Sequence, residues 1–354
     1  MNLTLESNVT LSALHPTEVP QALRFVSFTV CIAVITLGVI GNGLVLMIFG
    51  LKWSNLKSWE ILLFNLALAD FLNSTVVPVK TIFDLLYISL YHIGHNGCKV
   101  ISFIGLTSMT ASALNLLAVS IDQFISIKWL INQRPHICSL LTVTSVWLAA
   151  AGLGFFYLID KNIKLKLHAD NVYTCFNSMK QNHYIKFSIT AVCIQCFIPI
   201  LLMTILYSAV ILELKKKNGT LNHRLQQNKK VTKMIFTIVL IFYICFLPAN
   251  IFFMWYLFYG QNHPTQIMKS IYDILALLQM CNSIVNPIIY SILHASFKKD
   301  IANAFSLCCN KIHNWSTMQN TTQSMLSRND SRGERLISNS SFDSRKTRTS
   351  STLF

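Results

Sequence analysis

The chain has 354 residues, of which 53% are hydrophobic and only 12% are charged, and its mean hydropathy is +0.49. A soluble domain has about 25% charged residues, so the composition excludes an ordinary soluble protein and indicates an integral membrane protein. The formal net charge is +15. In a soluble chain that charge would suggest nucleic-acid binding, but here the basic residues gather at the ends of apolar segments and in the tail. We therefore expect no nucleic-acid partner.

Seven apolar segments follow one another along the chain, and each is long enough to cross a bilayer as a helix. They occupy Phe25–Leu51, about 59–87, Val100–Ile121, Pro135–Ile159, Phe187–Leu212, Met234–Tyr259 and Ile274–His294. Short connections should make consecutive helices neighbours. The sequence therefore predicts an all-α membrane protein, a bundle of seven transmembrane helices. It has no visible internal repeat, which argues against an inverted-repeat transporter.

The basic residues and the glycosylation sequons predict the same orientation. Lysine and arginine crowd the loop between the fifth and sixth segments, as is typical of cytoplasmic loops. The sequons at Asn2 and Asn8 become usable if the N-terminus is extracellular, with the first segment as a signal-anchor. We expect an extracellular N-terminus at 1–24, a transmembrane domain at 25–295, an amphipathic eighth helix at 296–309 and a disordered cytoplasmic tail at 310–354.

The ten cysteines fall into two groups. Most lie within apolar segments and are expected to be buried hydrophobes. Cys98 and Cys175 both fall outside the membrane on the extracellular side, so a disulfide between them is predicted. Cys308 and Cys309 follow the short basic amphipathic stretch after the seventh segment, which predicts reversible palmitoylation, with two free thiols as the alternative.

Polar residues and prolines recur at about one landmark per segment, and in this the chain resembles a rhodopsin-like (class A) G-protein-coupled receptor over about residues 25–309. The landmarks are Asn42, Asp70, Trp147, Pro199, Tyr207, Phe242, Pro248, Asn286, Pro287 and Tyr290. The resemblance implies a multi-pass receptor of the plasma membrane. It also implies an extracellular small-molecule or peptide ligand and a heterotrimeric G protein. The basic, hydroxyl-rich tail at 344–351 reads as a substrate of receptor kinases whose phosphates recruit arrestin, or as a merely solvated tail.

Asp70 lies in the middle of the second segment, where a carboxyl group is costly unless it is paired or hydrated. Ser108, Ser112, Asn282 and Asn286 are expected to meet it from the third and seventh helices. Their oxygens and one carboxylate form a hard-ligand set suited to a small cation, like the family's sodium pocket. The alternative is a neutral, water-filled hydrogen-bond network around protonated Asp70. An allosteric sodium ion held by Asp70 is the one metal we expect, and no cofactor.

Three prolines within the segments, Pro199, Pro248 and Pro287, each remove a backbone hydrogen bond and permit a kink. Kinked helices packed on one another offer two arrangements of similar energy, which a signalling bundle requires. By resemblance, Phe246 is the aromatic switch below the ligand pocket, in place of the commoner Trp, and Phe242 transmits its movement. The alternative for both phenylalanines is ordinary core packing.

The third segment departs from the family at Asp122-Gln123-Phe124, where Asp-Arg-Tyr is usual. By resemblance, the missing arginine pairs with the aspartate at rest and reaches Tyr207 and the G protein when active. Gln123 has no charge and forms no salt bridge with Asp122. Two consequences are open: coupling is weakened, as in a scavenging or arrestin-biased receptor, or basal activity is raised. We expect a coupling-competent but atypical receptor.

Several functions are excluded or disfavoured by single positions. Gly105 stands where amine receptors of the family have an aspartate, and Met280 where opsins have their lysine, so a biogenic amine and retinal are disfavoured. The sixth-segment motif, Phe242 to Pro248, looks like the branch of nucleotide, lipid-mediator and protease-activated receptors. No intramembrane metal constellation or Ser-His-Asp arrangement is apparent in the sequence, so we expect no enzyme.

Lys80 is the sharpest clue to the ligand, since it lies ten residues beyond Asp70, or about 15 Å along a helix. A lysine at that depth needs an anion, which is either an internal partner, Asp84 or Asp273, or an acidic group of the ligand. We expect an anionic lipid or nucleotide first and a peptide second. The residues expected to contact the ligand are Lys80, Lys99, Gly105, Phe246, Phe253 and Asp273.

Overall fold

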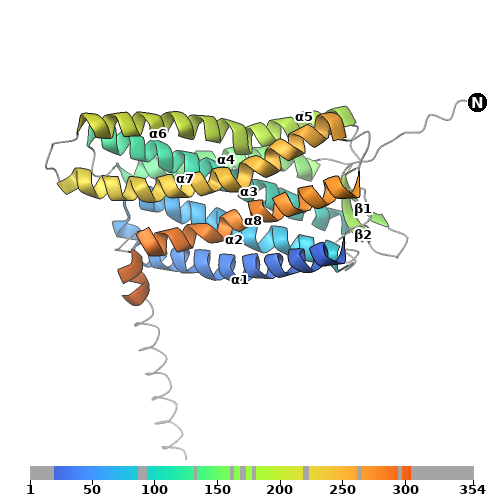
Figure 1. Cartoon of the computed structure of the whole chain (residues 1–354). Coiled ribbons are helices and arrows are strands. Elements are labelled where there is room, and N and C mark those ends of the chain that lie inside the picture. Colours follow the sequence, from blue (N-terminus) through green and yellow to red (C-terminus); the bar gives the residue numbers. More distant parts are fainter. Residues whose placement is uncertain are drawn as a thin grey trace, which may run out of the picture. The chain divides into compact units, whose positions relative to one another are not determined.

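A computed structural model describes residues 20–86, 94–130, 134–159, 163–167, 173–177, 181–217, 223–260, 265–293 and 297–303. Within these ranges seven helices are long and apolar enough to cross a membrane, and they run side by side (Figure 1). The helical elements are α1 (Gln21–Leu51), the 3-10 turn η3 (Trp53–Asn55), α2 (Ser58–Leu85), α3 (Gly94–Trp129), α4 (His136–Ile159), α5 (Gln181–Val192), η5 (Cys193–Phe197), α6 (Ile198–Lys216), α7 (His223–Trp255), η6 (Tyr256–Gly260) and α8 (Gln266–Leu293). The predicted seven-helix bundle is confirmed.

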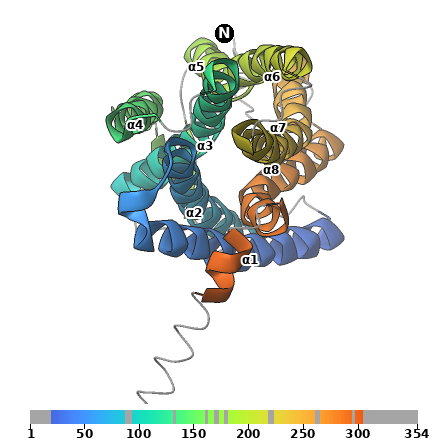
Figure 2. The same ribbon diagram turned by 90° about the vertical axis from the view of Figure 1, so that its left-hand side faces the viewer.

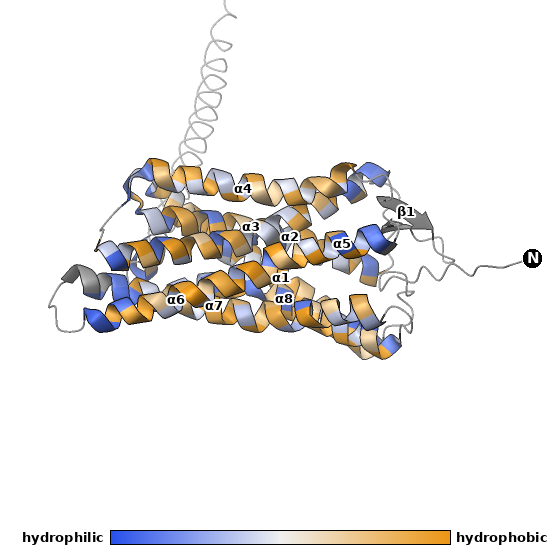
Figure 3. Cartoon of the chain, turned by 90° about the horizontal axis from the view of Figure 1, so that it is seen from above, coloured by the Kyte–Doolittle hydropathy of each residue, from blue (hydrophilic) through white to orange (hydrophobic). Residues whose placement is uncertain are grey.

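The outward faces of these helices are apolar, as a lipid environment requires. Leu148 and Phe155 of α4 are 69% and 54% exposed, and Leu201 of α6 is 61% exposed. Apolar residues run along most of α4, α6 and α7, while hydrophilic residues gather toward the helix ends (Figure 3). A helix that is apolar on all sides and satisfies its own backbone groups is a membrane span. The chain is therefore a multi-pass membrane protein.

The helices are longer than the predicted apolar segments because polar residues continue them beyond the hydrocarbon. The third helix runs from Gly94 to Trp129, whereas the apolar segment covers only Val100–Ile121. It ends where Leu130 adopts a left-handed conformation with φ of 52°, which is rare for a bulky side chain and breaks the helical hydrogen-bond pattern.

The fifth span contains a π-helix that the sequence did not predict. α5, η5 and α6 follow one another without a break, and η5 is the π-helical turn Cys193–Phe197. Pro199 is the second residue after it and has no N–H to donate to the preceding turn, so a wider turn accommodates the lost bond. Gln195 within this turn is buried, and its Nε2 donates to Thr110 Oγ1 of α3 at 2.7 Å.

Close contacts between α1, α2 and α8 depend on glycine in α1. A Cβ at Gly38 would lie 2.5 Å from the Cβ of Ser74 in α2, and one at Gly41 would lie 3.1 Å from the ring of Pro287 in α8. α3 packs against α2, α4, α6 and α7, and the end-on view places it next to α2 and α4 (Figure 2). Polar side chains of α2, α3 and α8 are thereby brought together inside the bundle.

Two smaller features complete the described structure. The strands β1 (Ile163–Leu167) and β2 (Tyr173–Asn177) before α5 pair antiparallel, with Leu165 opposite Cys175. Residues 297–303 are helical, within the predicted eighth helix. Phe297 is buried, with ring centroids 5.7 Å from Phe49 and 5.9 Å from Tyr290. Asn2, Asn8, Cys308, Cys309 and the predicted tail lie outside the described residues.

Candidate functional site

Asp70 is the centre of a buried hydrogen-bond network that joins three helices. Its carboxylate is fully buried. Ser112 Oγ of α3 donates to Oδ1 at 2.8 Å, and Asn286 Nδ2 of α8 donates to Oδ2 at 2.6 Å. Ser283 Oγ, also of α8, lies 3.4 Å from Oδ1. Three neutral donors on two partner helices therefore satisfy a carboxylate that would be very costly alone in the membrane.

The network extends to α1 through Ser283. Asn73 Nδ2 donates to Ser283 Oγ at 2.9 Å, and Asn42 Nδ2 donates to the Ser283 backbone oxygen at 2.8 Å. The side-chain oxygens of both asparagines are buried and have no hydrogen-bond partner within the part of the chain that the structure describes. The side-chain oxygens of Asn42 and Asn73 are therefore available to accept a further hydrogen bond or bind a cation close to Ser283, which also contacts Asp70.

Two of the four predicted partners of Asp70 are not bonded to it, and one observed partner was not predicted. The structure brings Ser112 and Asn286 to the carboxylate, whereas Ser108 Oγ donates to the Gly105 backbone oxygen of its own helix at 3.1 Å. A helical serine readily bonds a carbonyl of the preceding turn, so it needs no partner on another helix. Asn282 is buried, but among the described residues the hydrogen bonds to Asp70 come from Ser112, Ser283 and Asn286. Ser283 was missed, although it lies three residues before Asn286 and therefore on the same face of the helix.

Asp122 has an ion-pair partner that the sequence analysis did not identify. Arg134 Nη1 lies 3.3 Å from Asp122 Oδ1, and the aspartate side chain is only 2% exposed. Ser58 Oγ of α2 donates to the same oxygen at 2.7 Å and lies 2.8 Å from Ser139 Oγ of α4. The charge of Asp122 is therefore balanced from the α3–α4 connection and not from its neighbour Gln123.

Gln123 connects α3 to α7 by a neutral hydrogen bond. Thr232 Oγ1 of α7 donates to Gln123 Oε1 at 3.4 Å, and both residues are buried. Nearby, Lys217 Nζ at the end of α6 donates to the backbone oxygens of Ile127 and Lys128 at 2.6 and 2.8 Å. These oxygens belong to the last turn of α3, where helical carbonyls lack internal donors and cations are favoured. The same end of α3 is thus held to both α6 and α7.

The expected aromatic switch residues form a stacked pair inside α7. Phe242 and Phe246 are buried, and their ring centroids are 4.2 Å apart with an interplanar angle of 27°. Pro248 lies inside the same helix and Pro287 inside α8, as predicted. The stacked rings are part of the packed core of the bundle.

Tyr207 of α6 and Tyr290 of α8 are large buried residues, 5% and 1% exposed. The Tyr290 hydroxyl has no hydrogen-bond partner among the residues described, and the Tyr207 hydroxyl lies beside that of Ser120 without a well-formed bond. Tyr207 packs its ring on Phe236 of α7 at 5.2 Å. A buried hydroxyl without a partner is unfavourable, so an arrangement in which these groups gain partners would be favoured.

In the extracellular half of the bundle, the two lysines expected to contact the ligand have partners within the protein. Lys80 Nζ lies 2.9 Å from Asp84 Oδ2, and both side chains are 34% exposed. The anion that Lys80 needs is therefore Asp84 of its own helix and not an acidic group of a ligand. Lys99 Nζ donates to the Leu158 backbone oxygen of α4 at 3.3 Å, and is therefore engaged by the scaffold. The helix-end carbonyl of Leu158 attracts this cation, which sequence alone cannot show.

The remaining expected ligand residues are partly buried. The ring centroids of Phe253 in α7 and Tyr272 in α8 are 5.9 Å apart. Asp273, the residue after Tyr272, is partly buried. A Cβ at Gly105 would lie 3.5 Å from Val77 of α2, an ordinary contact distance. Cys98 is fully buried and is bonded in a disulfide. The side chain of Cys175 lies outside the described residues, so their pairing stays a prediction.

Comparison with known proteins agrees with this arrangement of seven helices around a buried carboxylate. A family model described as 7 transmembrane receptor (rhodopsin family) matches residues 41–290, and the chain belongs to that family. Galanin receptor 2a of Danio rerio is 28% identical over 289 residues, which cover 78% of this chain and 78% of that receptor. The neuromedin-K receptors of Cavia porcellus and Rattus norvegicus are 26% and 25% identical, and the matches cover 78% of this chain but 64% and 62% of those receptors.

Family membership confirms the expected class of the protein. The rhodopsin family consists of G-protein-coupled signalling receptors, for which the plasma membrane is the typical location. The chain spans less than two thirds of the neuromedin-K receptors that it matches.

Proposed function

We propose that the chain is a receptor that transmits an extracellular peptide signal to a heterotrimeric G protein. The observation that carries the signalling part is the network around Asp70, which joins α2, α3 and α8 through Ser112, Ser283 and Asn286. Its polar groups have several alternative partners inside a packed bundle, so two arrangements of similar energy are available. A ligand that binds one arrangement more tightly shifts the population toward it.

Two findings favour a peptide over the anionic ligand that the sequence suggested. Lys80 and Lys99, the cations expected to meet a phosphate or carboxylate, are engaged by Asp84 and by the Leu158 carbonyl. The relatives include receptors named for galanin and neuromedin-K, which are peptide receptors. The aromatic pair Phe253–Tyr272 offers a contact surface of the kind that peptide side chains use.

We expect Gln123 to permit coupling, because the hydrogen bond by which it joins α3 to Thr232 of α7 is neutral. A neutral bond is weaker than a charge-assisted bond, so α7 should be released more easily from α3. This supports a regulated receptor with raised basal activity over a scavenger that does not couple. Receptor kinases would then phosphorylate the hydroxyl-rich tail at 344–351, and its phosphates would recruit arrestin.

The residues around Asp70 also fit a sodium ion. Carboxylate and hydroxyl oxygens are hard ligands, and Asp70, Ser112 and Ser283 would supply them. The unpartnered oxygens of Asn73 and Asn42 lie on side chains that contact Ser283. A bound cation would supply positive charge to the carboxylate and so stabilise the resting network.

The ligand class is tested in cells that express the chain at the surface and report G-protein dissociation. The cells are exposed to a panel of synthetic peptides and, separately, to lysophosphatidic acid and nucleotides. We expect a response to a peptide, lost in Phe253→Ala. Lys80→Gln and Asp84→Asn should then have equal effects, because each removes the same internal pair. A response only to the phosphate compounds, lost in Lys80→Gln but kept in Asp84→Asn, would contradict the peptide proposal.

A further inference from the structure

Tyr243 of α7 forms a hydrogen bond to the neighbouring helix α6 inside the membrane. Its hydroxyl donates to the Ile200 backbone oxygen at 2.9 Å and lies 3.0 Å from Thr204 Oγ1. Thr204 itself donates to the same Ile200 oxygen at 2.7 Å. A carbonyl oxygen has two lone pairs and accepts from both hydroxyl groups. The Tyr243 hydroxyl is thereby joined to two groups of α6.

This contact lies on the lipid-facing side of the bundle. Tyr243 is at the middle of the span Asn228–Tyr259 and is partly buried, while Thr204 is exposed. Leu201 is 61% exposed and Ile244 is 62% exposed, and each lies within one turn of the contact on its own helix. No water in the hydrocarbon replaces a broken hydrogen bond. Separating α7 from α6 at this point therefore leaves the Tyr243 hydroxyl without a partner.

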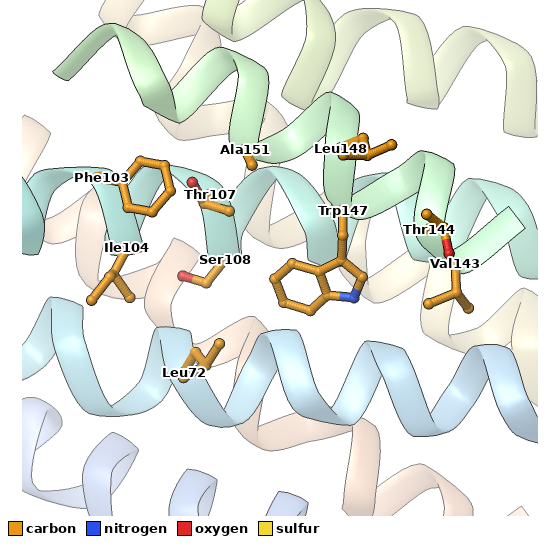
Figure 4. A pocket seen from close by; sticks show the side chains of 10 residues that line it. All are labelled: Leu72, Phe103, Ile104, Thr107, Ser108, Val143, Thr144, Trp147, Leu148 and Ala151. Atoms are coloured by element: carbon orange, nitrogen blue, oxygen red, sulfur yellow. The ribbon is translucent and has the colours of Figure 1, made fainter. Parts of the chain in front are cut away.

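A hydroxyl group on the lipid-facing surface does not by itself connect two helices. Thr144 of α4 lines an apolar groove (Figure 4) and donates to the Leu140 backbone oxygen of its own helix at 2.9 Å. Ser208 of α6 donates to the Thr204 backbone oxygen at 2.8 Å. These short side chains reach a carbonyl of the preceding turn. The rigid ring of Tyr243 instead carries its hydroxyl away from its own backbone, so the bond is made to another helix.

The bond holds the part of α7 that Pro248 allows to bend. Pro248 lies inside α7, where it removes a backbone hydrogen bond and permits a kink. Tyr243 comes five residues before Pro248, which is about 8 Å along a helix. A bend of about 10° away from α6 would move Tyr243 by about 1 Å. That movement lengthens a 2.9 Å bond beyond hydrogen-bonding distance.

We propose that the Tyr243 hydroxyl is an autoinhibitory latch, which holds residues 223–247, the cytoplasmic half of α7, to α6 in the resting receptor. The latch rests on the proposed function, because it restrains the coupling proposed above when no ligand is bound. It is separate from the bond between Gln123 and Thr232, which holds the same half of α7 to α3. Thr232 and Tyr243 are eleven residues apart, or about 16 Å along a helix, so the two bonds act independently.

Two measurements on the full-length receptor test the latch. Agonist-independent nucleotide exchange is measured in membranes with equal surface levels of wild type and Tyr243→Phe, which removes the hydroxyl and keeps the ring. In lipid nanodiscs without G protein, spin labels report the distance between α6 and α7. The labels are attached to azido amino acids encoded in place of Leu212 and Gln226, which are both exposed.

We expect basal exchange about threefold higher in Tyr243→Phe, the effect of one hydrogen bond between membrane helices. The population of a second distance between α6 and α7 should rise by the same factor. Ser208→Ala is the matched control, because it removes a lipid-facing hydroxyl that is bonded within α6, and it should equal the wild type in both measurements. Tyr243→Phe combined with Thr232→Val should reach about ninefold, since independent effects multiply.

The two measurements separate a failure of the latch from a failure of the proposed function. An unchanged distance in Tyr243→Phe would overturn the latch. Unchanged or lower exchange in Tyr243→Phe, beside a wild type that activates the G protein, would also overturn it, as would a double variant no more active than Thr232→Val. A second distance in Tyr243→Phe without exchange in any variant would support the restraint of α7 by α6 and contradict the proposed coupling instead.

Discussion

At the scale of single residues, the two buried carboxylates are satisfied by partners outside their own helices. Asp70 is satisfied by Ser112, Ser283 and Asn286, and Asp122 by Arg134 and Ser58. The sequence predicted that Asp70 needs polar partners, because an intramembrane carboxylate is costly. It did not distinguish Ser283 from Ser108, because both serines lie on suitable helices and only the packed rotamers decide.

Asp70 should make the stability of the protein depend on sodium. Replacing N-methyl-D-glucamine chloride by sodium chloride at equal ionic strength should raise the Tm of the wild type by about 3 °C, because an ion that binds only the folded state stabilises it. Asp70→Asn should abolish the shift. Ser108→Ala is the matched control, since its hydroxyl bonds Gly105 and not Asp70. An equal shift in Asp70→Asn would exclude this site.

The pair Asp122–Arg134 should respond differently to loss of each partner. Arg134→Gln leaves a carboxylate that is 2% exposed without its cation, which we expect to cost about 3 kcal/mol of unfolding free energy. Asp122→Asn leaves Arg134, which is 27% exposed and can reach water, so it should cost about 1 kcal/mol. Reversible denaturation in detergent measures both. Equal losses would show that the carboxylate is solvated in the resting protein.

At the scale of elements, the seven spans follow from long apolar segments, and these were predictable from composition and length alone. The positions of the helix ends were not predictable in this way. Polar residues extend α3 beyond its apolar segment, so that the helix runs from Gly94 to Trp129. The π-helix Cys193–Phe197 was also missed, since Pro199 predicts a disturbed turn but not its form. The close packing of α1 against α2 depends on Gly38. The sequence shows a small residue there but does not show that another helix contacts it.

Gly38 and Gly50 of α1 should respond in opposite ways to alanine. A Cβ at Gly38 would lie 2.5 Å from Ser74 Cβ, so Gly38→Ala should force α1 from α2 and cost about 2 kcal/mol of unfolding free energy. Gly50 has nothing within 4 Å of such a Cβ, and Gly50→Ala should stabilise the helix by about 0.5 kcal/mol. Thermal unfolding of both variants checks this. A neutral Gly38→Ala would mean that α1 and α2 separate at little cost.

At the scale of the whole molecule, hydrogen bonds between buried polar residues join helices that are distant in sequence. Asn42, Asp70 and Ser283 connect α1, α2 and α8, while Gln123 and Thr232 connect α3 and α7. The family was recognisable from its landmark residues, which stand on the expected spans. The neutral bond between α3 and α7 was not predictable, because Thr232 lies more than a hundred residues from Gln123 and shares no motif with it.

Basal G-protein activation tests the central claim most directly. Agonist-independent nucleotide exchange is measured in membranes with equal surface levels of wild type, Thr232→Val and Thr237→Val. Thr237 bonds Lys233 within α7 and serves as the control. Loss of the Gln123–Thr232 hydrogen bond should raise basal exchange about threefold in Thr232→Val, the effect of a weak hydrogen bond. Thr237→Val should match the wild type. Exchange no higher than in membranes without the protein, for every variant, would contradict the account of a coupling receptor.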